Sequence, residues 1–178
     1  SSDGLKPAAR RLAWWYYTDF VRSGAALDPA SQKKLSACNR RLAELFTLFG
    51  QNLLADEENQ TFTLSAPEDL AGLPTSMVNP AGPTVIRNTR SSAEPFLTFS
   101  ERRDLREKVW RMWVSRGDSN NHPIAAEILL LRARRARLLG HPTHAHWRLE
   151  DSMAGTPERA LELLTRVWKP AVARVKQE

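Results

Sequence analysis

The sequence predicts a mainly α-helical, elongated protein with one small irregular insert. Two observations support this prediction. Apolar side chains recur at helical spacing along a stretch of about 30 residues, and five of the eleven prolines fall between residues 61 and 99. The 178 residues are 42% hydrophobic and 26% charged. That balance supports a hydrophobic core and excludes disorder of the whole chain.

The first expected helix spans residues 7–23 and is ended by Gly24. Its apolar residues gather on one side, which we expect to be buried. They are Leu12, Trp15, Tyr16 and Phe20. With the helix that follows it, this segment should form an antiparallel hairpin over residues 1–59.

The second expected helix is the longest in the chain. It begins at Pro29 after the N-cap residue Asp28 and extends to about Glu58. At about 1.5 Å per residue, such a helix is on the order of 45 Å long. Its apolar stripe has spacings of 3, 4, 3, 4 and 4 and consists of Leu35, Cys38, Leu42, Leu45, Phe49 and Leu53.

Residues 60–99 read as a loop-rich insert with a small β-hairpin. Side chains alternate between polar and apolar over residues 61–64, and residues 83–86 favour a second short strand. Prolines punctuate the rest of this insert, which disfavours long regular elements there.

Helices resume over residues 100–178. The expected helices are 101–116 after Ser100, 123–139 after Asn121, and a last one that begins at Pro157 after Thr156. Pro170 should kink the last helix without ending it. No Gly or Pro follows Pro170, so we expect the last helix to be interrupted at the end of this sequence. We also expect the whole chain to be one helical segment of a larger body. Its apolar stripe through Trp168 and Val175 should then be exposed and promote self-association.

A histidine cluster is the only candidate metal site. His141, His144 and His146 lie close together, with Glu150 or Asp151 as further ligands. Residues two apart face different sides of a helix, which argues against a shared ion. The zinc-peptidase motif His-Glu-x-x-His is absent. The sequence therefore assigns no catalytic and no metal-binding residue, and the substrate-binding residues are unknown.

Two other kinds of chemistry are disfavoured. Cys38 is the only cysteine, lies on the apolar stripe and has no base near it in sequence, so a structural role is favoured. A phosphate-binding loop would need closely spaced glycines, which the chain lacks. The longest uncharged apolar run, residues 128–131, is far too short for a membrane span of roughly 20 residues.

Basic residues raise the alternative of a nucleic-acid-binding module, with a net charge of +6. They are Arg132, Arg134, Arg135 and Arg137, preceded by Arg102, Arg103, Arg106, Lys108, Arg111 and Arg116. Acidic residues interleave with them, namely Glu101, Asp104, Glu107 and Glu127, which favours solvated faces with local ion pairs and no nucleic acid. Trp110 and Trp113 are spaced as packing residues.

Five segments, in unbroken order, are similar to the bacterial dipeptidyl carboxypeptidases of the thimet oligopeptidase family. They are QNLLAD at 51–56, RSSAEPFLTFS at 90–100, WVSRGD at 113–118, RLLGHPTHAHWRLEDSMA at 137–154 and VWKPAV at 167–172. The resemblance covers nearly the whole chain from about Leu12. Residues 75–89 and 118–121 look shorter than in the family, so residues are expected to be missing there.

The resemblance implies a zinc peptidase that removes C-terminal dipeptides from short peptides. The family binds zinc through two His and a Glu, in a part of the protein that this chain does not match. The chain then corresponds to the helical channel wall upstream of that motif. It would be inactive and zinc-free by itself, and would support a catalytic half of the same polypeptide in the cytoplasm, with the periplasm as the alternative. A peptide-binding scaffold without catalysis is the other alternative.

Overall fold

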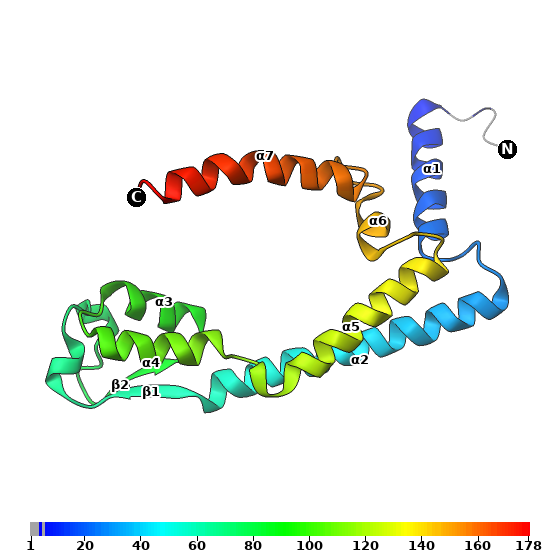
Figure 1. Ribbon diagram of the computed structural model, residues 1–178. Helices are drawn as coiled ribbons and strands as arrows, with labels where there is room; N and C mark the ends of the chain where they lie inside the picture. The colour runs from blue at the N-terminus through cyan, green and yellow to red at the C-terminus, as the bar shows by residue number, and fades with distance from the viewer. Residues whose placement is uncertain (1–3, 5) are drawn as a thin grey trace. The chain divides into compact units, whose positions relative to one another are not determined.

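The computed structural model describes Gly4 and residues 6–178, and it is mainly helical (Figure 1). The helices are α1 (Pro7–Arg22), α2 (Pro29–Asn59), α3 (Arg90–Phe99), α4 (Arg103–Val114), α5 (Asp118–Leu138), α6 (His144–Leu149) and α7 (Pro157–Val175). Strands β1 (Thr61–Leu64) and β2 (Thr84–Arg87) form one antiparallel hairpin. The predicted fold class, mainly α with a small hairpin insert, is confirmed. None of the described helices combines the length and the hydropathy that crossing a membrane requires.

The chain divides into two compact units. We call Ser1–Ala43 with Ile128–Glu178 the split unit, and Glu44–Glu127 the continuous unit. Helices α2 and α5 each contribute one part to each unit. In the split unit they meet where the Cys38 thiol donates a hydrogen bond to the Leu131 carbonyl oxygen over 3.4 Å.

The long helix α2 confirms the predicted start at Pro29 and has 31 residues. The Asp28 carboxylate accepts hydrogen bonds from the backbone N–H groups of Ala30 and Ser31 at 3.0 and 3.1 Å, which caps the helix. Hydrogen bonds to Ser31 are the main reason why the pKa of Asp28 lies below its usual value. The buried part of the predicted stripe consists of Leu35, Cys38, Leu42 and Leu45.

The continuous unit has its own hydrophobic core between the hairpin, α3 and α4. It is formed by Leu64, Ile86, Ala93, Phe96, Leu105 and Val109. Thr61 pairs with Arg87 and Leu64 with Thr84 in the hairpin. Helix α3 occupies the end of the predicted insert, where a helix was not expected. Phe96 is wholly buried there, so tertiary packing outweighs the helix-breaking effect of Pro95.

Helix α5 begins earlier than the sequence predicts. The predicted cap residue, Asn121, lies inside its first turns, because the helix starts at Asp118. The buried Asn121 side chain instead bonds to α2: its amide group donates to the Phe49 carbonyl oxygen over 3.3 Å and accepts from the Asn52 amide over 2.9 Å. A side chain that reads as a local cap therefore joins two helices.

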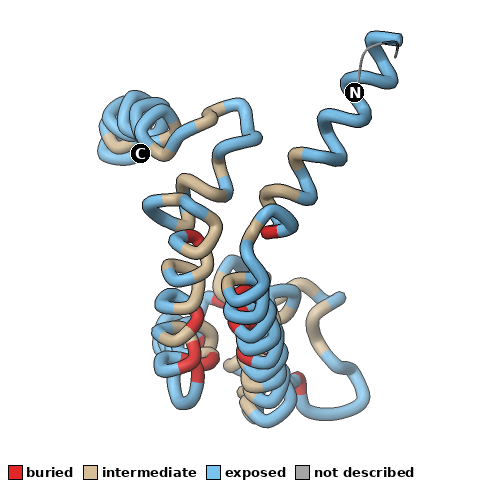
Figure 2. The backbone as a smooth tube through the Cα atoms, turned by 90° about the vertical axis from the view of Figure 1, so that its right-hand side faces the viewer, coloured by how far each residue is buried: buried red, intermediate tan, exposed pale blue. Residues whose placement is uncertain are grey.

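Helices α1 and α7 contain no buried residue (Figure 2). The predicted burial of one side of α1 is wrong for this chain, since Trp15, Tyr16 and Phe20 are 53%, 52% and 62% exposed. Thr156 caps α7 as predicted by accepting from the Arg159 N–H, and α7 continues through Pro170 to Val175.

Candidate functional site

The three clustered histidines lie in separate surroundings around α6. His146 is bound on both ring nitrogens: Nδ1 lies 2.8 Å from the Thr143 hydroxyl and Nε2 lies 3.5 Å from the Glu158 carboxylate. Hydrogen bonds from its own backbone N–H and from Thr156 lower the pKa of Glu158, and His146 lowers it further. This group links α6 to the start of α7.

Arg22, at the end of α1, takes up the two carboxylates that would complete a metal site. Its Nε lies 3.1 Å from Glu150, and its Nη1 pairs with Asp151. His141 Nε2 lies 3.9 Å from the same Glu150. Two further hydrogen bonds join Arg22 and Trp147, each from the side chain of one residue to the backbone of the other. Arg22 Nη2 donates to the Trp147 carbonyl oxygen over 2.7 Å, and Trp147 Nε1 donates to the Arg22 carbonyl oxygen over 3.3 Å.

His144 faces aromatic and cationic groups. Its ring centroid lies 5.7 Å from that of Trp147. Burial, followed by the charges of Arg132, Arg135 and Arg148, lowers its pKa. Both effects on the pKa favour the neutral form of this imidazole.

The geometry does not assemble a zinc-binding set from these groups. Among the described residues, no three His, Cys, Asp or Glu side chains lie close enough to hold one ion. In the segment 141–151, His146 contacts Thr143 and Glu158, while Glu150 and Asp151 pair with Arg22. The His144 ring lies beside Trp147. These described side chains therefore do not fit a common zinc ion.

The basic residues of α4 and its flanks form local ion pairs, as their interleaving with acidic residues predicts. Arg102 lies 2.9 Å from both Asp69 and Asp104, and Arg111 lies 2.7 Å from Glu107. The hydrogen bond between Arg102 and Asp104 raises the pKa of the arginine and lowers that of the carboxyl group.

The two tryptophans of α4 differ. Trp113 is half-buried against the core of the continuous unit, and the Arg116 guanidinium lies 4.5 Å from its ring centroid. Trp110 is 51% exposed, so the packing role expected for it is wrong in this structure. Arg116 also pairs with Glu57 of α2 at 2.5 Å.

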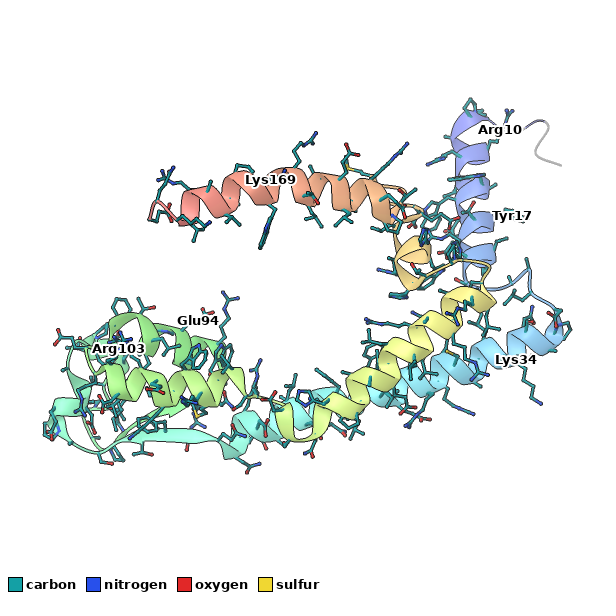
Figure 3. The ribbon with its side chains drawn as sticks, in the orientation of Figure 1. Arg10, Tyr17, Lys34, Glu94, Arg103 and Lys169 are labelled. Atoms are coloured by element: carbon teal, nitrogen blue, oxygen red, sulfur yellow. The ribbon has the colours of Figure 1, made fainter. Side chains whose placement is uncertain are left out.

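Two helices of the split unit present unusually apolar exposed surfaces. In Figure 3, side chains project from α7 around Lys169 and from α1 around Tyr17. The exposed apolar residues of α7 are Leu161, Leu163, Leu164, Val167, Trp168 and Val175, and those of α1 are Leu12, Trp14, Trp15, Tyr16, Tyr17 and Phe20. The sequence predicts an exposed stripe on α7 but a buried one on α1. The prediction fails for α1 because amphipathic spacing marks an apolar side of a helix without showing whether another element covers it.

Comparison with known proteins finds that this chain is similar to peptidases. Residues 96–178 match the family model of Peptidase family M3. The chain is 29% identical to the dipeptidyl carboxypeptidase of Escherichia coli (strain K12), over 98% of this chain and 28% of that protein. It is 28% identical to the probable cytosolic oligopeptidase A of Arabidopsis thaliana over the same shares, and 29% identical to oligopeptidase A of Salmonella typhimurium over 90% of this chain and 26% of that protein.

The chain thus spans about a quarter of the length of these relatives. Similarity extends over nearly all of its residues, and it includes dipeptidyl carboxypeptidases from two bacteria. The resemblance of this chain to the dipeptidyl carboxypeptidases of the thimet oligopeptidase family is therefore confirmed.

Proposed function

We propose that this chain is a non-catalytic helical segment of a zinc-dependent peptidase that removes C-terminal dipeptides from short peptides. In this role it forms part of the channel wall and supports the catalytic half of the same polypeptide. The family is one of peptidases, and the similarity spans 98% of the chain but only 28% of the Escherichia coli protein. Catalysis and zinc binding would then belong to the part of the relatives that this chain does not match.

The exposed apolar surface of α7 is the observation that most favours packing of this chain against a catalytic half. Leu161, Leu164 and Trp168 recur at spacings of three and four residues and are 63%, 65% and 69% exposed. Contiguous apolar surface of this kind on a soluble protein usually marks a contact site. A catalytic half of the same polypeptide is the partner that this proposal assigns to it. The cytoplasm is the proposed compartment, in line with the name of the cytosolic relative from Arabidopsis thaliana.

The first test addresses catalysis. The 178-residue chain, mixed with a short peptide and zinc, should release no dipeptide and should hold no stoichiometric zinc after dialysis, because its histidines face separate partners. Mass spectrometry of the peptide and elemental analysis of the protein give the two readouts. Zinc bound one to one, with release of dipeptides that a chelator abolishes, would refute the proposal.

The second test addresses the apolar surface. We expect the chain to self-associate at high concentration, and the double substitution Leu164→Gln with Trp168→Gln to weaken that association. Ala173→Gln is the matched control, because Ala173 is exposed and lies about 180° from Leu164 on the helix. Sedimentation velocity over a range of concentrations distinguishes the variants. A monomeric parent chain, or equal association by both variants, would contradict a contact role for this surface.

A further inference from the structure

Trp147 of α6 is surrounded by nitrogen-bearing side chains from two helices. The Arg135 guanidinium of α5 lies 4.6 Å from the indole centroid, and the Arg148 guanidinium lies 5.7 Å from it. The His144 ring lies 5.7 Å from the same indole. We call Arg135, His144, Trp147 and Arg148 the cationic cluster. Each arginine gains a cation–π contact, but such contacts do not neutralise the charges.

No carboxylate is directed at this cluster within the described part of the chain. The groups that act on His144 are Arg132, Arg135 and Arg148, and those that act on Arg135 are Cys38, Arg132 and Arg148. The nearest acidic residues in sequence, Glu150 and Asp151, are paired with Arg22. Arg135 and Arg148 therefore form no ion pair with a carboxylate among the described residues, and the proximity of their two positive charges is unfavourable unless an anion binds between them.

Two buried nitrogens of the cluster also lack hydrogen-bond partners among the described residues: Nε of Arg135 and Nδ1 of His144. Another nitrogen of the same guanidinium, Nη1 of Arg135, donates to the Asn39 side-chain oxygen over 3.3 Å. Buried polar atoms are nearly always satisfied in folded proteins, so each of the two unsatisfied nitrogens calls for a partner. Oxygen atoms of a bound ligand would supply such partners.

We propose that the cationic cluster is a binding site for an oxyanion, a carboxylate or a phosphate-like group, with Arg135, Arg148 and His144 as its donors. The Nε edge of a guanidinium matches two oxygens of such a group, and charge-assisted hydrogen bonds of this kind are stronger than neutral ones. Arg148 is exposed, so the cluster is accessible from solvent on its side. This inference does not rest on the proposed peptidase role, since binding is measured without peptide hydrolysis.

Sulfate is the probe, because it stays charged across the pH range in which histidine titrates. We expect sodium sulfate to raise the pKa of His144, followed by NMR of the histidine ring protons, with His144→Asn identifying its signal. A rise of about one unit corresponds to about tenfold tighter binding by the protonated imidazole. Sodium chloride at equal ionic strength is the reference. If sulfate moves the His144 signal no more than chloride does, the proposal fails.

Variants separate a built site from a general charge effect. Arg148→Gln, at an exposed position, should reduce the sulfate effect severalfold, whereas Arg137→Gln, at an exposed position near the end of α5, should leave it unchanged. Arg135→Gln should abolish the effect, with circular dichroism as the check on folding. Equal losses in Arg137→Gln and Arg148→Gln would overturn the proposal in favour of non-specific attraction.

The source of the oxyanion is distinguished with a tripeptide blocked at both ends, carrying a central Glu or, as its control, a central Gln. A response to the Glu peptide alone assigns the site to acidic side chains of a polypeptide. A response to sulfate alone assigns it to a free inorganic oxyanion. A response to neither refutes the site.

Discussion

Single residues already make the stability of this chain depend on pH. Burial and neighbouring arginines hold the pKa of His144 below its usual value of 6.5. The unfolded chain then binds a proton more readily than the folded one, so the free energy of unfolding should fall as pH drops from about 6.5 through the lower, folded-state pKa.

We expect His144→Gln to flatten this pH dependence, in urea midpoints measured between pH 7.5 and pH 5. His122→Gln, with a side chain 78% exposed, is the control and should keep the parent's slope. A slope that His144→Gln leaves intact would show that the arginines do not act on this imidazole.

The buried leucines of α2 should dominate the stability of their helix. Leu42 and Leu45 are 2% and 1% exposed, so replacement of either by Ala should lower the free energy of unfolding by roughly 2–5 kcal/mol, through lost transfer energy and a residual cavity. Lys34→Ala, at an exposed position of the same helix, should change it by less than about 0.5 kcal/mol. Guanidinium denaturation monitored by circular dichroism measures both, and the reverse order would place the buried face elsewhere.

Gly117 tests how two helices are joined. Gly117 lies between α4 and α5 with φ of 83°, and a Cβ there would lie 2.9 Å from both Asn121 and Leu53. Its N–H donates to the Asp56 carboxylate over 2.6 Å. Gly117→Ala should therefore lower the free energy of unfolding by about 1–2 kcal/mol through the left-handed backbone alone. The close contacts of the new Cβ with Asn121 and Leu53 should lower it further.

Gly50 is the matched control for that substitution. It lies inside α2, and among the described residues beyond its chain neighbours no side chain comes within 4 Å of the position that a Cβ would take. Gly50→Ala should stabilise the chain by roughly 0.5–1 kcal/mol. Thermal unfolding of the two variants should shift in opposite directions, and a shift in the same direction would contradict the different backbone geometries.

Sequence predicts these elements where their signals are local. Caps such as Asp28 and Thr156 act within three residues, so the starts of α2 and α7 could be predicted. Helix α3 could not, because Pro95 weakens the local signal while the burial of Phe96 depends on residues far away in sequence. The prediction that Asn121 is a helix cap is wrong for the same reason, since its partners Phe49 and Asn52 lie 72 and 69 positions earlier in the sequence.

At the scale of the whole molecule, a net charge of +6 makes nucleic-acid binding the main alternative function to test. Three of the basic residues, Arg102, Arg111 and Arg116, already pair with carboxylates, and acidic residues interleave with the basic ones. We therefore expect weak binding, with a Kd above about 1 μM at physiological salt, to labelled duplex DNA and single-stranded RNA in anisotropy titrations.

The decisive comparison for nucleic acid is between two salt concentrations. Binding below about 1 μM that weakens steeply between about 50 and 200 mM salt would favour the alternative function. It should also be lost when the run Arg132, Arg134, Arg135 and Arg137 is replaced by Gln, but not when Lys33 and Lys34 are replaced.

The candidate site was the least predictable part of the molecule. The histidine segment was visible in the sequence, but its partners were not: Arg22 lies 125 positions before Trp147, and no local pattern marks it as their contact. Likewise, the gathering of Arg135 and Arg148 on one indole depends on how α5 and α6 meet. Side-chain chemistry is readable from sequence, whereas long-range juxtaposition needs the fold.

The reciprocal hydrogen bonds between Arg22 and Trp147 also bear on the order of events during translation. At roughly 5–20 residues per second, the ribosome needs roughly 6–25 s to add the 125 residues that separate them. During that interval Glu44–Glu127 is synthesised without interruption and carries its own core. The continuous unit can therefore fold on the nascent chain before α6 has been synthesised. Until then α1 lacks its contact with α6, and its aromatic residues are accessible to chaperones.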